Sequence, residues 1–275
     1  MRSIVKASLL IVLSSASVAF AQTPIPLTVS GNQVQGRFEL PGGISGDLTI
    51  TFESADGLTP TALEASASLV SPLDAALLAR LPGLVSAPVA FPVLLRIDPS
   101  ASSALSFEGE YTMSLHTLNL ELNCAVPMSL LKSPDGGLFQ DVTKLEARGS
   151  YRDDGGGGDF SEFMIVIDNR PIDTVIAGKF DALQATLNND AALMPPTVVS
   201  ALQTFLSQAR TLYQSGNTLG AIGQMTSFSD YVKAHSGTDI PDVWRANDPN
   251  TVNVAGLLRS GADTLKFSLD RKTSS

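Results

Sequence analysis

The chain has 275 residues, of which 44% are hydrophobic and 16% are charged, a composition typical of a globular protein rather than a disordered one. Its 18 lysines and arginines face 27 aspartates and glutamates, and the formal net charge of −9 argues against nucleic acid or anionic lipid as a partner. The single cysteine, Cys124, excludes an intrachain disulfide, so stability has to come from a buried core.

The first 21 residues have the three parts of a secretory signal peptide. A basic start with Arg2 and Lys6 precedes an apolar run over 7–13, and the segment closes on Ala19-Phe20-Ala21. The apolar run is too short for a permanent membrane anchor. We therefore expect cleavage after Ala21 and a mature chain that is secreted or periplasmic, without a permanent membrane anchor.

Alternation of apolar and polar residues predicts strands over 34–40, 48–52 and 63–69, joined as a meander by glycine-rich turns. Ser71-Pro72 predicts the cap of a short helix through Arg80. Further strands are predicted over 93–97, 105–115, 118–122, 126–131, 145–151 and 160–168. The parity of the apolar residues changes near His116-Thr117, which indicates a bulge or a tight bend.

Apolar residues at spacings of three and four predict four amphipathic helices after Pro171. The first two begin near Pro171 and Pro196, and Gly216 is expected to end the second. Thr218 is expected to cap the third, and Asp248-Pro249 the fourth, which continues to Leu269. Short connections between these helices favour antiparallel packing.

The predicted fold is α+β with two domains, an antiparallel β-sandwich followed by an antiparallel α-helical bundle. The expected boundaries are 1–21 for the signal peptide, 22–168 for the sandwich, 169–270 for the helices and 271–275 for a disordered tail.

Two stretches resemble a group of bacterial exported proteins of unknown function. The first comprises Phe139–Thr143, Gly149–Arg152 and Gly158–Phe163, and it is similar to the closing hairpin of β-sandwich modules in bacterial surface proteins. The second runs from Leu202 to Leu269 and resembles the helical hairpin module that follows such sandwiches. The resemblance implies an exported sandwich-plus-helix architecture and transfers no catalytic residues.

The sequence contains no complete motif for the common catalytic chemistries. The two histidines, His116 and His235, lie in different predicted domains and outside any zinc pattern. Ser129–Lys132 fits Ser-x-x-Lys and Ser215–Asn217 fits Ser-x-Asn, as in penicillin-recognising enzymes, but Ser129 falls in a predicted strand and the third element, Lys272–Ser274, departs from Lys-Thr-Gly. We therefore predict no catalytic residues and no cofactor.

Several acidic residues and the only tryptophan leave binding alternatives open. Asp153, Asp154 and Asp159 flank Gly155–Gly158, which we interpret as a hairpin tip, and carboxylates on one loop could bind calcium. Glu108 and Glu110 share one strand face, which is better explained as an exposed face than as a catalytic pair. Trp244 is expected to close the end of the helical bundle rather than to stack on a sugar.

The sequence thus predicts a non-enzymatic exported protein that serves interaction or structure at the cell envelope, with a protein or another envelope component as its partner. A calcium- or glycan-binding module is the alternative, and a carboxylate-based hydrolase is the third possibility.

Overall fold

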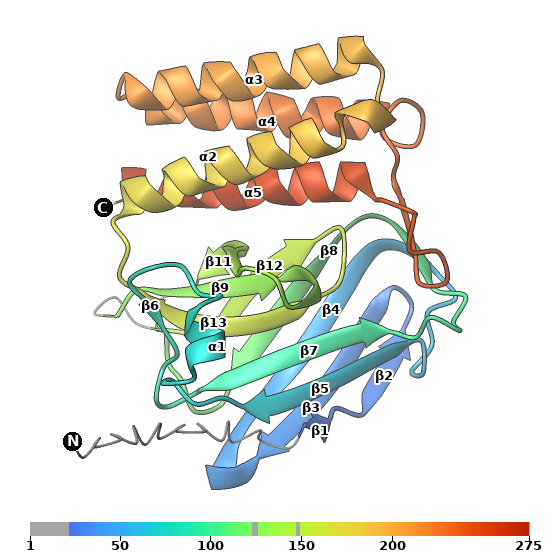
Figure 1. Cartoon of the computed structure of the whole chain (residues 1–275), viewed down its shortest axis with the longest axis vertical. Coiled ribbons are helices and arrows are strands. Elements are labelled where there is room, and N and C mark those ends of the chain that lie inside the picture. The colour runs from blue at the N-terminus through green and yellow to red at the C-terminus, as the bar shows by residue number, and fades with distance from the viewer. Residues whose placement is uncertain (1–21, 123–125, 147–148, 275) are drawn as a thin grey trace, which may run out of the picture.

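A computed structural model describes residues 22–122, 126–146 and 149–274. The fold is α+β, with two antiparallel sheets in a sandwich-like arrangement and a C-terminal helical region that lies at one end of the molecule (Figure 1). The predicted signal peptide and Cys124 lie outside the described residues.

The first sheet has the strand order β1-β5-β7-β13-β9-β10, and β6 pairs with β13 outside this path. Its strands are β1 (Thr23–Pro24), β5 (Leu63–Leu69), β6 (Val85–Ser86), β7 (Val93–Pro99), β9 (Met128–Ser133), β10 (Gln140–Asp141) and β13 (Glu162–Asp168).

The second sheet has the order β11-β12-β8-β4-β3-β2, and β14 pairs with β8. Its strands are β2 (Leu27–Ser30), β3 (Gln33–Leu40), β4 (Ile44–Asp56), β8 (Ser106–Thr117), β11 (Thr143–Glu146), β12 (Arg152–Gly157) and β14 (Val243–Arg245). The predicted meander is wrong at its third strand, because β5 crosses to the first sheet, where its apolar face is buried in the core.

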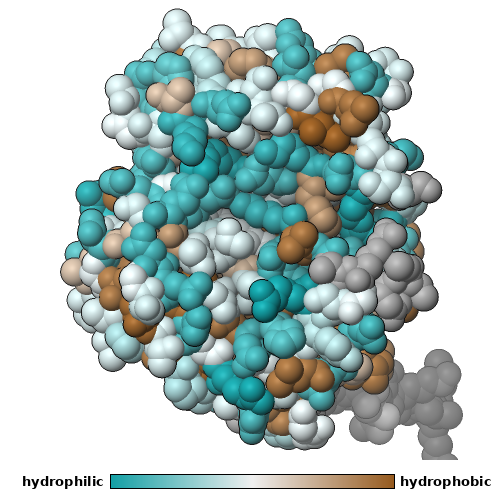
Figure 2. All heavy atoms as spheres, turned by 180° about the vertical axis from the view of Figure 1, so that it is seen from behind, coloured by the Kyte–Doolittle hydropathy of each residue, from teal (hydrophilic) through white to brown (hydrophobic). Residues whose placement is uncertain are grey.

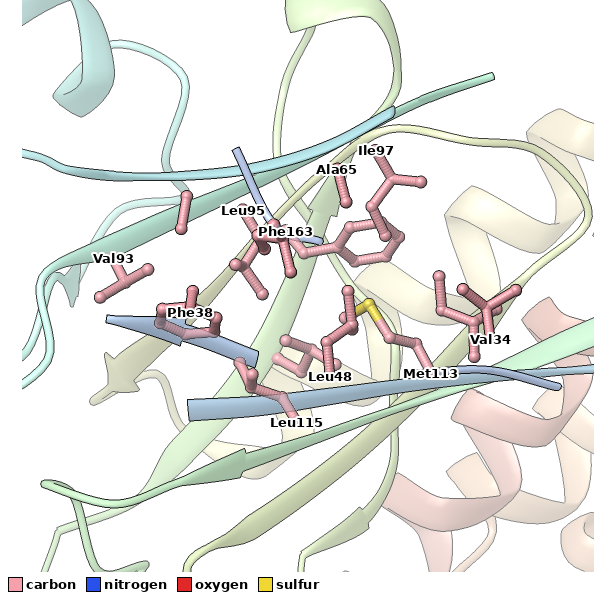
Figure 3. Close-up of a cluster of buried hydrophobic side chains, with 14 of the residues drawn as sticks. Val34, Phe38, Leu48, Ala65, Val93, Leu95, Ile97, Met113, Leu115 and Phe163 are labelled. Atoms are coloured by element: carbon pink, nitrogen blue, oxygen red, sulfur yellow. The ribbon is translucent and has the colours of Figure 1, made fainter. Parts of the chain in front are cut away.

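Side chains from both sheets meet in one apolar core. Alternate residues of each strand point inward, which explains why the alternation in the sequence located most strands. Figure 3 shows members of this cluster from both sheets: Val34, Phe38, Leu48, Ala65, Val93, Leu95, Ile97, Met113, Leu115 and Phe163. Trp244 belongs to this core and not to the helical region, since its ring stacks on Phe107 at 5.4 Å and meets Phe160 edge-on at 5.2 Å.

The helical region consists of α2 (Ile172–Asn189), α3 (Pro196–Gln214), α4 (Thr218–His235) and α5 (Val254–Thr273). In Figure 1, α2 and α5 lie nearest the sheets and α3 and α4 lie beyond them. Their apolar faces pack into a separate core that includes Phe180, Leu202, Phe228 and Leu265. The division into two domains at residue 168 stays a prediction.

The helix boundaries correct three local predictions. The short helix α1 spans only Ala75–Leu78, because the Asp74 carboxylate accepts hydrogen bonds from the backbone amides of Ala76 and Leu77 and caps it there. Asn217 rather than Thr218 caps α4. Asn253, five residues after the predicted cap Asp248, caps α5, which continues to Thr273, into the predicted tail.

Three single-turn 3₁₀ helices complete the described elements. They are η1 (Pro41–Gly43), η2 (Pro134–Gly136) and η3 (Ala191–Leu193).

The segment over 118–151 also differs from the prediction. After β8 the chain bends at Leu118-Asn119, as the change of parity indicated, but Leu122 forms only an isolated bridge to Ser150 instead of a strand. The strand predicted over 145–151 is wrong, because β11 ends at Glu146 and the next strand begins at Arg152.

Candidate functional site

A seam rich in ion pairs joins the helical region to the sandwich, and it contains the candidate site. Helix α5 packs on β8, β11 and β12, while the two apolar cores remain separate clusters. Figure 2 shows hydrophilic residues gathered on the back face between the helices and the sheets. Burying charged groups is costly unless each is paired, so the pairing along the seam determines what it can bind.

Gly109 fixes the position of α5 on the second sheet. It takes a left-handed φ of 69° at an irregularity in β8, a conformation that glycine adopts without strain. Its amide donates to the Asp242 carboxylate at 2.8 Å, and its carbonyl accepts from the Asn253 side chain at 2.6 Å. The residue that caps α5 therefore also anchors the helix to the sheet.

The irregularity places Glu110 under α5. Glu110 is only 8% exposed and accepts hydrogen bonds from Lys144 and, at 3.4 Å, from Arg259. Burial raises the pKa of Glu110 against the lowering effect of Lys144. The expectation that Glu108 and Glu110 are both exposed is therefore wrong for Glu110, because the extra residue at Gly109 turns it under the helix.

A cavity of about 470 Å³ opens in the seam between α2, α5 and the strands β9, β10 and β12. The face of α2 that lines it includes Val175, Gly178, Lys179, Leu183 and Thr186, and Asp190 extends this wall just after the helix. The opposite wall includes Lys132, Asp141, Val142 and Gly156–Asp159, and α5 contributes Leu257, Ser260, Gly261 and Thr264. This size and mixed lining lie within the range of small-molecule sites.

Two ion pairs form the polar walls of the cavity: Lys179–Asp141 is buried, and Lys132–Asp159 is partly buried. The Lys179 ammonium lies 3.1 Å from the Asp141 carboxylate and donates to the Thr264 carbonyl at 3.0 Å. Burial would raise the pKa of Asp141, but Lys179 and the hydrogen bonds from Thr143 outweigh it and hold this pKa below its ordinary value. The Lys132 ammonium donates to the Asp159 carboxylate and, at 2.9 Å, to the Asp159 carbonyl.

The two ends of α2 mark the two ends of the cavity. Arg170 precedes the helix, and its guanidinium donates to both oxygens of Asp168, at 2.8 and 2.5 Å. Asp190 follows the helix, and burial raises its pKa. Within the described residues, the Asp190 carboxylate has no hydrogen-bonded or ion-pair partner.

The run Gly155–Gly158 is not a hairpin tip, because most of it forms β12, between β11 and β8. A Cβ on Gly157 would lie 2.6 Å from the Lys132 nitrogen, and one on Gly158 would lie 2.5 Å from the backbone nitrogen of Leu257. Glycine is therefore required because side chains and α5 approach the strand closely.

Asp153 lies in this strand and is fully buried. Neither oxygen of its carboxylate has a hydrogen-bond partner within the described part of the chain. Burial and the nearby Glu146, Asp141 and Asp154 raise the pKa of Asp153 well above its ordinary value, against the lowering effect of Arg271.

The premise of a calcium loop at Asp153, Asp154 and Asp159 is not met, because Asp153 and Asp154 lie on a strand and Asp159 pairs with Lys132. No group of three or more histidine, cysteine, aspartate or glutamate residues with metal-binding geometry occurs in residues 22–122, 126–146 and 149–274.

The residues of the other catalytic motifs have local structural partners. His116 lies 3.6 Å from Asp47, and His235 lies 2.6 Å from Asp239. Ser129 and Lys132 both lie in β9, where Ser129 faces Asp168 at 3.5 Å and Lys132 pairs with Asp159, so they form no serine–lysine dyad. Asn217 caps α4 through its side chain.

The position of Lys179 in the sequence could have indicated a residue of the cavity wall. It lies four residues after Val175 and three after Ile176, on the apolar face of a predicted helix, where a charged side chain needs a buried partner. Its partner Asp141 is far away in the sequence, and no local pattern joins the two.

A family model described as "Family of unknown function (DUF6689)" matches residues 9–273. A search of curated proteins gives no match. Within the described ranges, the helices are too short or too polar to cross a membrane.

Proposed function

Because the chain belongs to DUF6689, a family of unknown function, we propose its role from its own geometry: it is a non-enzymatic binding protein that holds a small polar ligand in the seam cavity. The single observation that carries this proposal is the cavity itself, whose walls combine the buried Lys179–Asp141 pair with apolar side chains. Polar groups that are fixed in an otherwise apolar cavity orient a ligand and discriminate between ligands.

The location proposed for this activity is outside the cytoplasm, in the periplasm or the cell envelope. The support is the signal-peptide pattern over 1–21, with its basic start and its Ala19-Phe20-Ala21 ending. We also propose that the sandwich and the helical region are two domains that meet at the seam, since each has its own apolar core. Sites between domains are frequent places for ligands.

Glycine at two helix positions allows a matched test of the cavity. Gly178 lies in α2 at the cavity, and Gly223 lies in α4 away from it. A Cβ on either residue would meet no atom of the described chain within 4 Å, apart from the backbone of its own helix and its neighbours. Gly178→Trp therefore introduces a side chain at the cavity without a clash at Cβ, and Gly223→Trp is its control.

The experiment incubates the mature chain with the small-molecule fraction of the organism that encodes it, removes unbound compounds by gel filtration, and identifies what remains by mass spectrometry. Wild type and Gly223→Trp should retain the same compound, and Gly178→Trp should lose it. Retention by all three proteins, or by none, would contradict the proposed site. Recovery of a chemically altered compound after long incubation would contradict the non-enzymatic role.

A further inference from the structure

The shape of the cavity restricts the ligand that the proposed function requires. Its lining follows one face of α2 from Val175 to Asp190, a length of roughly 20 Å at the rise of an α-helix. A volume of about 470 Å³ over that length leaves room for one narrow chain. A compact or branched molecule would leave most of this length unfilled, so the shape favours an unbranched ligand.

The charges of the lining exclude a strongly anionic ligand. Each of its cations already has a carboxylate partner: Lys132 has Asp159, Lys179 has Asp141, and Arg170 has Asp168. Because these carboxylates already balance the cations, an anion in the cavity would place its charge beside them without an uncompensated cation to offset it. Asp190, the remaining charged group of the lining, is itself an acid.

The paired ions still offer hydrogen bonds of both kinds. An ammonium group has three donors, and the Lys179 contacts to Asp141 and Thr264 use two of them. The two hydrogen bonds of Lys132 likewise leave one donor, and an ionised carboxylate has about four acceptor sites. A hydroxyl group both donates and accepts, so a ligand with many hydroxyl groups matches this surface without a net charge.

Apolar side chains lie between these polar groups along the cavity. Val175, Leu183 and Leu257 line it together with the ion pairs. A ligand with alternating hydroxyl groups and C–H faces would satisfy both kinds of surface.

We propose that the seam cavity binds an unbranched, neutral oligosaccharide. This inference rests on the proposed function, and it names the class of ligand that the same cavity takes. A peptide bound by strand addition is the less favoured occupant, because it would need a free strand edge. The adjacent edge strand β10 has two residues, and Lys179 of α2 already contacts its Asp141.

Isothermal titration calorimetry of the mature chain tests the ligand class. The neutral probes are linear tetramers of α-1,4-glucose, β-1,4-glucose and β-1,4-N-acetylglucosamine. Tetragalacturonate is the anionic probe of similar length, and tetraalanine is the peptide probe.

At least one neutral tetramer should bind wild type and Gly223→Trp with a Kd below about 1 mM, and Gly178→Trp should bind it at least about tenfold more weakly. Tetragalacturonate and tetraalanine should each bind at least about tenfold more weakly than that tetramer. Absence of binding by all three neutral probes, or tighter binding of the anionic or peptide probe, would overturn the inference.

Failure of the sugar class remains distinguishable from failure of the site. If wild type retains a compound from the extract that Gly178→Trp loses, but no neutral tetramer binds, the cavity is a ligand site and the oligosaccharide class is wrong. If Gly178→Trp retains the compound as wild type does, both proposals are wrong.

Discussion

At the scale of single residues, the buried charges of the seam divide into those with a partner and those without one. In the Lys179–Asp141 pair, one carboxylate oxygen lies beside the ammonium and the other accepts from the Thr143 amide, whereas both oxygens of Asp153 have no hydrogen-bond partner within the described residues. These two arrangements predict opposite effects of removing a charge.

Asp153→Asn should stabilise the protein at neutral pH. Because the folded-state pKa of Asp153 is raised, the unfolded chain loses this proton first as the pH rises above the ordinary value of 3.8, and stability falls from there up to the folded-state pKa. The asparagine side chain does not ionise, so the variant does not lose this stability as the pH rises. Its Tm should exceed that of wild type at pH 7 by a few degrees, at about 2–4 °C per kcal/mol for a chain of this size.

The advantage of Asp153→Asn should vanish below about pH 4, where both states of the wild-type residue are protonated. Asp56→Asn, at an exposed strand end, is the control and should leave Tm unchanged at either pH. A Tm for Asp153→Asn that equals or falls below that of wild type at pH 7 would mean that the Asp153 carboxylate has a stabilising partner.

Lys179→Met should destabilise the protein by about 3–5 kcal/mol, because it leaves Asp141 buried without its cation. The double variant Lys179→Met, Asp141→Asn should recover most of this loss, since the asparagine oxygen can still accept from the Thr143 amide. Chemical denaturation of the three proteins measures both values. If the double variant is as unstable as the single one, the pair is not the source of the loss.

At the scale of elements, the close approach of β12 and α5 decides how the seam is built. Gly158 lies against the backbone of Leu257, and α5 begins at the Asn253 cap that also holds Gly109. The glycine run is therefore a packing requirement of the interface between strand and helix.

Gly158→Ala and Gly223→Ala should change stability in opposite directions. The Cβ that Gly158→Ala adds would lie 2.5 Å from the Leu257 nitrogen, so α5 has to shift and stability should fall by about 1–3 kcal/mol. Alanine at position 223, in an open part of α4, should raise stability by about 0.5–1 kcal/mol. Urea denaturation tests the pair, and equal stability of Gly158→Ala and wild type would show that α5 is not held closely against β12.

Local patterns predicted the elements better than the seam. Alternation of apolar and polar residues predicts strands such as β3, and apolar residues at spacings of three and four predict α2 to α5. Both patterns arise because each element buries one face, so its apolar residues recur with the period of that element. The predictions for the glycine run and for Trp244 are wrong, since the roles of these residues depend on segments that meet only in the folded chain. The cavity could not be predicted from local patterns either, because Lys179 and Asp141 come from different elements.

At the scale of the whole molecule, the proposed ligand site lies where the sandwich and the helical region meet, so its integrity depends on both. A chain with a net charge of −9 is also consistent with a ligand that carries no negative charge.

The proposed export predicts the N-terminus of the mature protein. The small residues at Ala19 and Ala21 predict cleavage after Ala21, so N-terminal sequencing of the exported protein should begin at Gln22. Ala19→Asp should block processing and leave a longer protein on a gel, whereas Ser30→Asp, beyond the predicted cleavage site, should not. Recovery of a mature protein that still carries the first 21 residues would contradict cleavage.

Hydrogen–deuterium exchange of the mature chain, with and without the compound that it retains, shows whether the seam cavity is the ligand site. We expect slower exchange at Gln140–Val142, at Gly156–Asp159 and along α2, with little change in α3 and α4, which do not line the cavity. Protection confined to strands that do not line the cavity, or to α3 and α4, would place the ligand elsewhere and contradict the proposed site.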